Sequence, residues 1–315
     1  MSKPKIFSGR SNPVLAKAIA DYLEEPLGKV DLVEFKDGEM YVKFQENIRG
    51  RDVFIIQSTN APANNYLELF LMMDAARRAY AKRITAVIPY YGYARQDRKN
   101  TPRVAISAKL MANIISTSGA DRAISMDLHS PQIQGFFDIP FDHLYSSMIV
   151  VDYLKNREFM ENSVLMAPDI GGIKMARAYA QKLDKEIAVI DKRRPKVNKS
   201  EVMNIIGDVE GKNVLLLDDL VDTAGTLIHA AEKAMEKGAL SVYAAATHAV
   251  LSADAIERIE KSPIEKLIVT DTIPLRDKNK SDALEVISVA EIFGEAIKRI
   301  NREESISSLF QGQDY

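Results

Sequence analysis

The sequence contains no cysteine and no tryptophan among its 315 residues. Without cysteine, the chain cannot form disulfide bonds, use a thiolate in catalysis or bind zinc through cysteine. Long apolar runs are also missing, since stretches such as Val214–Leu217 fall far short of the ~20 residues that a membrane-spanning helix needs. These absences exclude disulfide scaffolds, cysteine enzymes and helical membrane proteins.

An excess of charge of one sign is absent too. The chain has 42 Lys and Arg residues against 44 Asp and Glu residues, a formal net charge of −2. A near-neutral total argues against bulk attraction to nucleic acid, although it does not exclude a local basic patch. The first residues contain no apolar stretch of the kind found in signal peptides. We therefore expect a cytoplasmic protein that binds neither nucleic acid nor membrane.

Apolar runs alternate with amphipathic stretches along the chain, and the length suggests about two domains. Continuously hydrophobic runs predict strands buried on both faces, as in parallel sheets covered by helices. The expected strands are 52–57, 84–89, 123–127, 163–167, 187–190, 213–217, 242–246 and 267–270. The expected helices are 65–80, 106–116, 173–183 and 226–236.

The fold class predicted from this alternation is α/β, with two domains that each contain a mainly parallel sheet flanked by helices. The alternation restarts near 145–153, so we place the domains at 1–147 and 148–300, with a tail at 301–315 that packs back on the N-terminal domain. The early segment 32–44 differs, because it alternates around Asp37-Gly38-Glu39 and predicts a hairpin or an irregular edge.

The most informative stretch is 214–238, in which a buried strand runs into two acids, a turn of small residues and an amphipathic helix. Small residues let backbone N–H groups converge, and a helix N-terminus adds partial positive charge, so the turn suits a phosphate monoester. It is not a Walker A loop, because no Lys follows the glycine. The acids are Asp218 and Asp219, and the turn is Asp222, Thr223, Ala224, Gly225 and Thr226.

Carboxylates beside a phosphate repel it, so the two acids need a separate explanation. They are explained if the ligand also carries hydroxyl groups, from which ionised carboxylates readily accept hydrogen bonds. A phosphate next to a diol describes a ribose 5-phosphate group. A simpler alternative is that Asp222 or Thr223 only caps the helix. Capping could explain either residue alone, but it does not explain why both acids and the small residues of the turn occur together.

The string DDLVDTAGT resembles the phosphoribosyl signature of type I phosphoribosyltransferase folds. With the motifs below, the chain is similar to ribose-phosphate diphosphokinases from 7–13 to 305–310. The resemblance implies two phosphoribosyltransferase-like domains and ribose 5-phosphate binding by Asp218, Asp219 and 222–226. It implies transfer of the β,γ-diphosphoryl group of ATP to the C1 hydroxyl of ribose 5-phosphate, which yields phosphoribosyl pyrophosphate and AMP for nucleotide biosynthesis.

Two segments resemble the ATP site of that family. VIPYYGYARQDRK, at 87–99, matches at Arg95 and Gln96, and FKDGEMYVKF, at 35–44, matches at Phe35, Asp37, Gly38 and Glu39. An arginine can bind phosphate oxygens, and an aromatic ring can stack on a base. Without the resemblance, Arg95 could be a stacked surface arginine and Asp37-Gly38 only a hairpin turn. In the family the second segment serves the ATP site of a neighbouring subunit.

The resemblance also implies a magnesium cofactor. His129, in DLHSPQ, and Asp169, in APDIGG, match metal-associated positions near the nucleotide phosphates. Magnesium prefers oxygen ligands and keeps several waters, so a histidine there would act through water or near the metal. The alternative for a lone histidine at a strand end is a structural role.

In the stretch 187–207, a buried strand is followed by the basic motif DKRRP and then by polar residues. This order predicts a basic loop after the strand. Phosphoryl transfer depends on positioning and on neutralising charge, and such a loop supplies both. By resemblance, Lys192 and Arg194 are catalytic, and Arg194 also binds ribose 5-phosphate. A solvated face or a nucleic-acid contact is the alternative.

The family's most common class forms homohexamers that inorganic phosphate activates and ADP inhibits, and we expect the same here by resemblance. Arginines suit oxyanion binding, and hydroxyl side chains can complete a cradle. Ordinary surface arginines are the alternative. The candidate regulatory residues are Arg49, Arg51, Arg77, Arg78, Ser307 and Ser308.

Two other functions remain open at this point. A purine or pyrimidine phosphoribosyltransferase would share the DDLVDTAGT loop but generally lacks DKRRP. A non-catalytic homologue that regulates an active subunit or binds nucleic acid should have damaged loops. Departures from the family pattern at Asp271, Ala249 and Asn100–Pro102 bear on sugar binding and regulation.

Overall fold

The computed structural model describes residues 3–193 and 202–310. Contacts between α-carbons divide the chain into two compact units, which are described separately below. The first comprises the described residues of Met1–Tyr145, Thr272–Pro274 and Ser288–Gln311. The second comprises those of Ser146–Asp271 and Leu275–Ile287.

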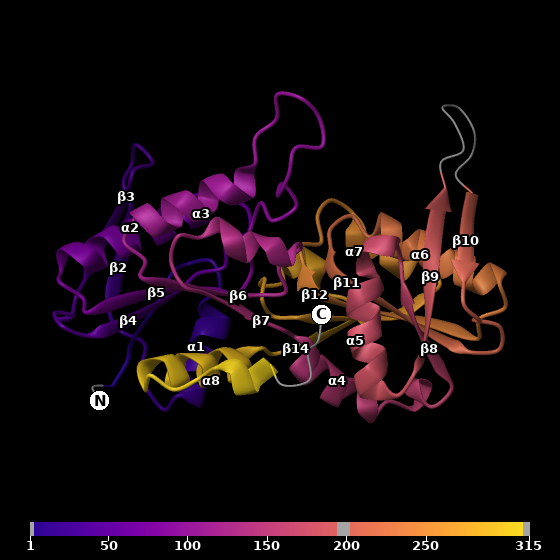
Figure 1. Cartoon of the computed structure of the whole chain (residues 1–315). Helices are drawn as coiled ribbons and strands as arrows, with labels where there is room; N and C mark the ends of the chain where they lie inside the picture. Colours follow the sequence, from indigo (N-terminus) through magenta and orange to yellow (C-terminus); the bar gives the residue numbers. More distant parts are fainter. Residues whose placement is uncertain (1–2, 194–201, 311–315) are drawn as a thin grey trace. The chain divides into compact units, whose positions relative to one another are not determined.

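The first unit is built on a five-stranded sheet in which neighbouring strands run parallel (Figure 1). Its central strands are mostly apolar and almost wholly buried, as expected for a parallel sheet covered on both faces. In spatial order the strands are β1 (Lys5–Ser8), β4 (Asp52–Ile56), β5 (Arg83–Ile88), β6 (Arg122–Met126) and β7 (Phe141–Leu144).

Helices cover both faces of this sheet. Figure 1 shows α2 (Asn64–Arg78) and α3 (Ser107–Thr117) on one face, where their apolar sides share a core with β4 and β5. On the other face α1 (Pro13–Tyr22) packs against α8 (Ala290–Asn301). Short 3₁₀ turns are η1 (Pro131–Phe136) and η5 (Ser307–Phe310).

The segment after α1 forms a separate two-stranded antiparallel sheet. Its strands are β2 (Val30–Glu34) and β3 (Met40–Phe44), joined by a turn in which Gly38 has φ of 90°. A positive φ of this size favours glycine, which has no Cβ to clash with the backbone. The hairpin predicted from the alternation around Asp37-Gly38-Glu39 is confirmed.

The second unit contains a seven-stranded sheet within the described part of the chain. All neighbouring strands run parallel except β10, which pairs antiparallel with β9 at one edge. In spatial order the strands are β10 (Val202–Ile206), β9 (Glu186–Arg193), β8 (Ser163–Ala167), β11 (Asn213–Val221), β12 (Ser241–Ala249), β13 (Ile264–Thr270) and β14 (Leu284–Ile287).

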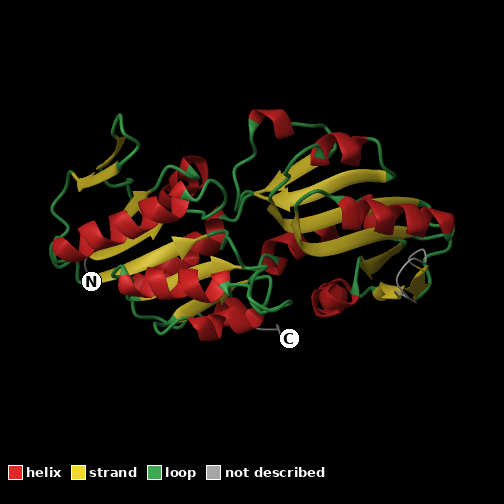
Figure 2. Ribbon diagram, turned by 90° about the horizontal axis from the view of Figure 1, so that it is seen from above, coloured by secondary structure: helices red, strands yellow, loops and turns green. Residues whose placement is uncertain are grey.

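Two buried clusters lie on opposite faces of this sheet. α6 (Gly225–Glu236) and α7 (Ala255–Glu260) pack on one face, and α4 (Ser147–Lys155) and α5 (Ile173–Leu183) contribute to the cluster on the other. Figure 2 shows the strands of each unit side by side in its sheet. The short 3₁₀ turns are η2 (Glu158–Met160), η3 (Ile170–Gly172) and η4 (Asp277–Asn279).

The predicted α/β class with two mainly parallel sheets is confirmed. The contacts place 288–300 in the first unit, whereas the sequence-based division put these residues in the second domain. The reason is a close approach of α8 to α1, where a Cβ on Gly294 would lie 2.3 Å from the ring of Tyr22. No helix in 3–193 or 202–310 is long and apolar enough to cross a membrane.

Candidate active site

Asp218 and Asp219 lie on β11, which runs on to Val221 rather than ending at Leu217 as predicted. The extension is held by parallel pairing with β12, in which Asp218 opposes Ala246 and Val221 opposes Ala249. The structure therefore places both acids at the carboxyl end of a central strand. In parallel sheets this edge is where ligands bind.

A third acid, Asp169, lies at the same edge of the sheet. It follows β8, the strand next to β11, and its carboxylate accepts a hydrogen bond from the Gly172 N–H at 3.2 Å. This bond caps the η3 turn and fixes the acid beside the end of β11. Burial raises the pKa of Asp218 well above its ordinary value, and the charges of Asp219 and Asp169 raise it further. Three carboxyl groups thus crowd this edge, and the crowding favours the protonated form of Asp218.

The loop Asp222–Thr226 joins β11 to α6, and its last two residues form the first turn of the helix. Ala224 has a left-handed backbone with φ of 60°, and α6 begins at the next residue, Gly225. The side chains of Thr223 and Thr226 are exposed. The first N–H groups of α6 and the two threonine hydroxyls can therefore donate to an anion at this end of the helix.

The structure adds two residues to this loop that the sequence did not suggest. Ser252 donates its hydroxyl to the Asp222 carboxylate, and Arg258 donates from Nη1 to the Thr223 carbonyl at 2.8 Å. Both residues follow β12, far along the chain from the loop. No local motif marks them, so only the tertiary contact could have found them.

In the first unit, the segment that contains Arg95 and Gln96 follows β5. Gly92 is packed so closely that a Cβ would lie 2.2 Å from the Thr59 carbonyl oxygen, and the Tyr66 hydroxyl donates to its carbonyl at 2.7 Å. Arg95 and Gln96 are exposed beyond this buried turn. The turn fixes the backbone from which these two side chains extend.

Gln96 also contacts the first residues of α3, at the far end of the loop that follows it. Its amide oxygen accepts from the Ser107 hydroxyl at 2.6 Å, and its carbonyl accepts from the Ala108 N–H at 3.2 Å. The Tyr91 hydroxyl, buried beneath, donates to the Ala108 carbonyl at 2.7 Å. These contacts tie the segment to the N-terminus of α3.

The β2–β3 hairpin carries, at its tip, the other residues predicted for the ATP site. Phe35 and Glu39 are exposed, and the Phe35 ring lies 5.8 Å from that of Tyr41. The Asp37 carboxylate accepts from the Glu39 N–H at 3.0 Å, so one of its oxygens serves the turn. The tip offers an exposed aromatic face beside carboxylates.

His129 is exposed in the loop after β6. The buried His143 accepts from the Leu128 N–H at 2.9 Å and so fixes the backbone next to His129. In the part of the chain that the structure describes, no three His, Cys, Asp or Glu side chains form a metal-binding cluster. His129 and Asp169 belong to different units, so each is considered within its own unit.

The predicted catalytic loop lies largely beyond what the structure describes. Lys192 is on β9, and Arg194 lies outside the described residues. The polar stretch predicted after DKRRP was expected to reach 207. It ends before 202, because 202–206 form β10 and pair with β9. Asn204 thus opposes Asp191, and Ile206 opposes Val189.

Several candidate regulatory residues meet at the start of β4. The Arg49 guanidinium lies 4.9 Å from the ring centre of Tyr80, and the Gly50 N–H donates to the Tyr80 carbonyl at 2.8 Å. Arg51 donates to the Lys3 carbonyl at 2.8 Å. Tyr80 lies two residues after the end of α2, so the loop before β4 and the end of that helix are adjacent.

The other candidates are held differently. Arg78 pairs with Asp74 one helical turn earlier, while Arg77 and Ser307 are exposed. Ser308 lies in η5. Asp52, the first residue of β4, accepts from the Asn301 side chain at 3.0 Å, so the chain leaves α8 close to the loop that holds Arg49 and Arg51.

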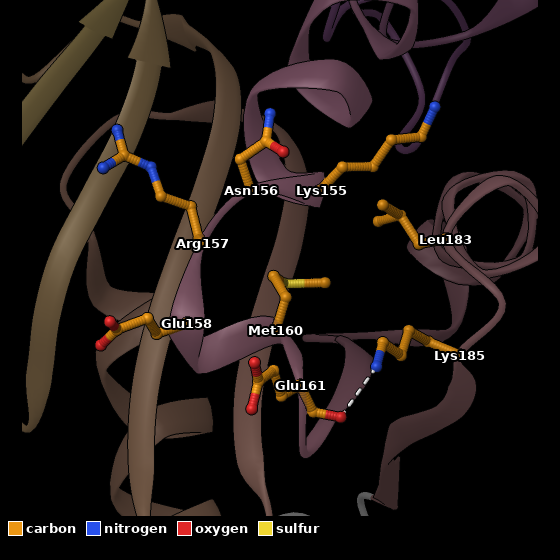
Figure 3. A pocket seen from close by; sticks show the side chains of 8 residues that line it. All are labelled: Lys155, Asn156, Arg157, Glu158, Met160, Glu161, Leu183 and Lys185. Atoms are coloured by element: carbon orange, nitrogen blue, oxygen red, sulfur yellow. Dashed lines mark hydrogen bonds between the residues drawn. The ribbon is translucent and has the colours of Figure 1, made fainter.

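A pocket of about 390 Å³ in the second unit contains none of the predicted site residues. Figure 3 shows it between Lys155, at the end of α4, and Lys185, whose Nζ donates to the Glu161 carbonyl at 3.0 Å. These residues precede β8 and β9, so the pocket lies at the amino ends of the strands. Asp169 and Asp218 lie at the opposite edge.

Comparison with known proteins identifies the family. The N-terminal domain of ribose phosphate pyrophosphokinase matches 4–119, and the phosphoribosyl synthetase-associated domain matches 194–311. The ribose-phosphate pyrophosphokinase of Chlorobaculum tepidum is 57% identical over 98% of this chain and 96% of its own length. That of Campylobacter jejuni is 53% identical over 97% of this chain and 98% of its own.

A solved structure is similar over nearly the same range. The crystal structure of phosphoribosylpyrophosphate synthetase from Mycobacterium smegmatis matches with a TM-score of 0.91 and 38% sequence identity. The match covers 96% of this chain and all of that one. Since both domain families and near-full-length relatives agree, the chain belongs to the ribose-phosphate pyrophosphokinase family.

Proposed function

We propose that this chain transfers the β,γ-diphosphoryl group of ATP to the C1 hydroxyl of ribose 5-phosphate. The C1 oxygen attacks the β-phosphorus, the bond from that phosphorus to the α,β-bridging oxygen breaks, and AMP leaves while the hydroxyl proton is released. The observation that carries the proposal is the pairing, at one sheet edge, of acids on β11 with the anion-binding loop Asp222–Thr226. Family membership supports it.

The second unit supplies the sugar site in this proposal. The loop binds the 5-phosphate through N–H groups and threonine hydroxyls, and Asp218 and Asp219 accept hydrogen bonds from the ribose hydroxyls. These contacts hold the C1 hydroxyl in one place, and positioning of this kind is, with electrostatic stabilisation, a main contribution of a protein to phosphoryl transfer. Lys192 and Arg194 are the proposed catalytic cations, and Arg194 also binds the sugar phosphate.

The first unit supplies the ATP contacts. Arg95 and Gln96 extend from the turn that Gly92 fixes, and we assign them to the nucleotide. The ring of Phe35 is about half exposed, at 49%, and suits stacking on adenine, with Asp37, Gly38 and Glu39 beside it. We propose that this hairpin serves the ATP site of a neighbouring subunit in a homohexamer.

Magnesium fits the acidic edge of the second unit. The burial and mutual repulsion that raise the pKa of Asp218 mark an excess of negative charge, which a divalent cation would offset. Mg²⁺ is usually held by one or two carboxylates with substrate phosphates and water rather than by a full protein cage. We propose Asp169 as the residue of this unit that holds it, while the metal role of His129, in the first unit, stays a prediction from the resemblance. When bound, it would neutralise charge on the nucleotide phosphates.

We also propose that Arg49, Arg51, Arg77, Arg78, Ser307 and Ser308 form a regulatory site. Inorganic phosphate would activate the enzyme there, and ADP would inhibit by placing its β-phosphate in the same position. The proximity of Arg49, Tyr80 and the end of α8 supports this assignment.

The cytoplasm supplies ATP, and we propose that the protein acts there.

The decisive experiment measures AMP release from ATP with and without ribose 5-phosphate. We expect AMP and phosphoribosyl pyrophosphate in equal amounts, only when Mg²⁺ and both substrates are present. Unphosphorylated ribose is the matched control and should give far less AMP. If no AMP forms and the protein instead consumes phosphoribosyl pyrophosphate with a free base, it is a phosphoribosyltransferase. If neither reaction occurs, the catalytic proposal is wrong.

A further inference from the structure

The loop Asp222–Thr226 is held from outside by the segment that follows β12. The Leu251 N–H donates to the Val221 carbonyl at 3.0 Å, and the Ser252 N–H donates to the Asp222 carbonyl at 3.1 Å. The Ser252 hydroxyl also donates to the Asp222 carboxylate. The segment that follows β12 thus binds the backbone at the start of the loop.

Arg258, on α7, holds the second half of the loop. Its Nη1 donates to the Thr223 carbonyl at 2.8 Å, and its Nη2 lies 3.6 Å from the position that a Cβ on Gly225 would occupy. The side chain is partly buried. The guanidinium therefore lies against the loop at two of its five residues.

The contact with Thr223 has a directional consequence for Ala224. The Thr223 carbonyl and the Ala224 N–H belong to one planar trans peptide, so they point in opposite directions. An arginine that binds the carbonyl from one side therefore turns the N–H to the other. Its charge also polarises the peptide group and makes that N–H a stronger donor to an anion.

Ala224 needs such support because its backbone is strained. With φ of 60° it lies in the left-handed region, which costs an L residue roughly 1–2 kcal/mol. Glycine would avoid this strain, but the chain has alanine here. A hydrogen bond to the preceding carbonyl therefore stabilises the conformation on which the loop depends.

Charge gives a second reason for an arginine at this place. Asp218, Asp219 and Asp169 gather at the edge where the loop lies, and a phosphate dianion would be repelled by them. The loop Asp222–Thr226 contains no Lys or Arg of its own. Arg258 brings a permanent positive charge to it, since a guanidinium does not lose its proton in proteins.

We propose that Arg258 is a positioning residue of the phosphate loop and that it makes the loop selective for a phosphate monoester dianion. It acts through the Thr223–Ala224 peptide and through its charge. The inference rests on the proposed function, because it takes the ligand of the loop to be the 5-phosphate of ribose.

Steady-state kinetics of Arg258→Ala test the assignment. We expect KM for ribose 5-phosphate to rise about tenfold or more, while KM for ATP and kcat change by less than about threefold, because the loop binds ground state and transition state alike. Arg258→Lys should recover part of the loss, since it restores the charge. Lys261→Ala is the matched control: this cation follows α7 but pairs with Glu257 and is 73% exposed. It should behave as the parent protein.

Calorimetric titration of ribose 5-phosphate without ATP separates this inference from the proposed function. A parent protein that binds the sugar phosphate but releases no AMP would refute the reaction, and the weaker binding of Arg258→Ala would still support the inference. If Arg258→Ala melts well below the parent, Arg258→Gln keeps a donor for the Thr223 carbonyl and carries the same comparison. Unchanged affinity in either folded variant, or equal increases in KM for both substrates, would overturn the inference.

Discussion

The carboxylate of Asp218 accepts a hydrogen bond from the backbone N–H of its neighbour Asp219, at 2.9 Å. The bond favours the charged form of Asp218, yet the net effect on its pKa is a marked rise, because burial and the charge of Asp219 outweigh it. The folded protein thus holds two carboxyl groups side by side and partly buried, which costs free energy through desolvation and repulsion. This arrangement suits ligand binding and lowers stability.

Asp218→Asn should stabilise the protein while it impairs catalysis. Because the pKa of Asp218 is higher in the folded state than its ordinary value of 3.8, the folded state binds this proton more tightly, and stability falls as the pH rises through both values. The uncharged isostere removes that loss, so Tm should rise by a few degrees at neutral pH. The gain should vanish below about pH 4, where both states are protonated.

Thermal melts across pH and AMP release measure both effects of Asp218→Asn. Activity should fall about tenfold or more, because an amide replaces an ionised acceptor of sugar hydroxyls. Asp277→Asn is the control of opposite sign, since Lys280 lowers the pKa of that exposed carboxyl. It should not raise Tm. A lower Tm for Asp218→Asn at neutral pH would contradict the interpretation.

Substitutions at Gly225 distinguish an effect on folding from an effect on ligand binding. A Cβ there would meet the Arg258 guanidinium at 3.6 Å and the Thr223 hydroxyl at 3.9 Å, which are ordinary contacts. Gly225→Ala should therefore fold with Tm close to that of the parent. Gly225→Val should raise KM for ribose 5-phosphate about tenfold, with KM for ATP nearly unchanged, because the larger side chain obstructs approach to the backbone. Equal impairment for both substrates would indicate a folding defect instead.

Gly92→Ala should destabilise the first unit. The new Cβ would lie 2.2 Å from the Thr59 carbonyl oxygen, so the backbone before Arg95 must move. We expect a loss of about 2–4 kcal/mol in the free energy of unfolding, measured by chemical denaturation. Gly135→Ala is the control, since no atom lies within 4 Å of its Cβ position. A change below about 0.5 kcal/mol for Gly92→Ala would show that the turn adapts.

Lys192→Ala and Arg194→Ala should lower kcat about a hundredfold, with smaller changes in KM, if these cations stabilise charge mainly in the transition state. Initial rates over both substrate concentrations give the two constants separately. Lys185→Ala, which alters a cation at the opposite edge of the sheet, is the control. Raised KM with an unchanged kcat would assign the two residues to binding alone.

Truncation after Glu304 should weaken phosphate activation and ADP inhibition while it leaves the catalytic residues in place. The cut keeps α8 and its contacts with the first sheet, including the bond from Arg83 to the Ile300 carbonyl at 2.8 Å, and removes Ser307. Rates at several phosphate and ADP concentrations measure the response. Truncation after Phe310, which spares Ser307, should respond as the parent. Full regulation without 305–315 would remove the tail from the proposed site.

The elements best predicted from the sequence are those whose signal is local. β8 and α5 have the predicted bounds, because a buried apolar run and a helical period are both visible within a few residues. The proposed phosphate loop could be predicted for the same reason, since Asp222–Thr226 follow Asp218 and Asp219 closely in the sequence. The order of strand, acids, turn and helix by itself also indicated the chemistry of the ligand.

Other features depend on partners distant in the chain. β11 continues through its two acids because backbone pairing with β12 does not require apolar side chains. α8 belongs to the first unit because Gly294 lets it approach Tyr22. The candidate regulatory arginines are scattered in the sequence, and only folding brings Arg49 to Tyr80.

The sequence by itself determined the α/β class and the parallel sheets, and it predicted the strand, turn and helix around Asp222–Thr226, because hydrophobic period and turn chemistry are properties of neighbouring residues. Tertiary structure alone decided that Asp169 joins Asp218 at one sheet edge and that Arg258 supports the Thr223–Ala224 peptide. The physical reason is that a hydrogen bond or a charge acts over a few ångströms in space, whatever the separation along the chain.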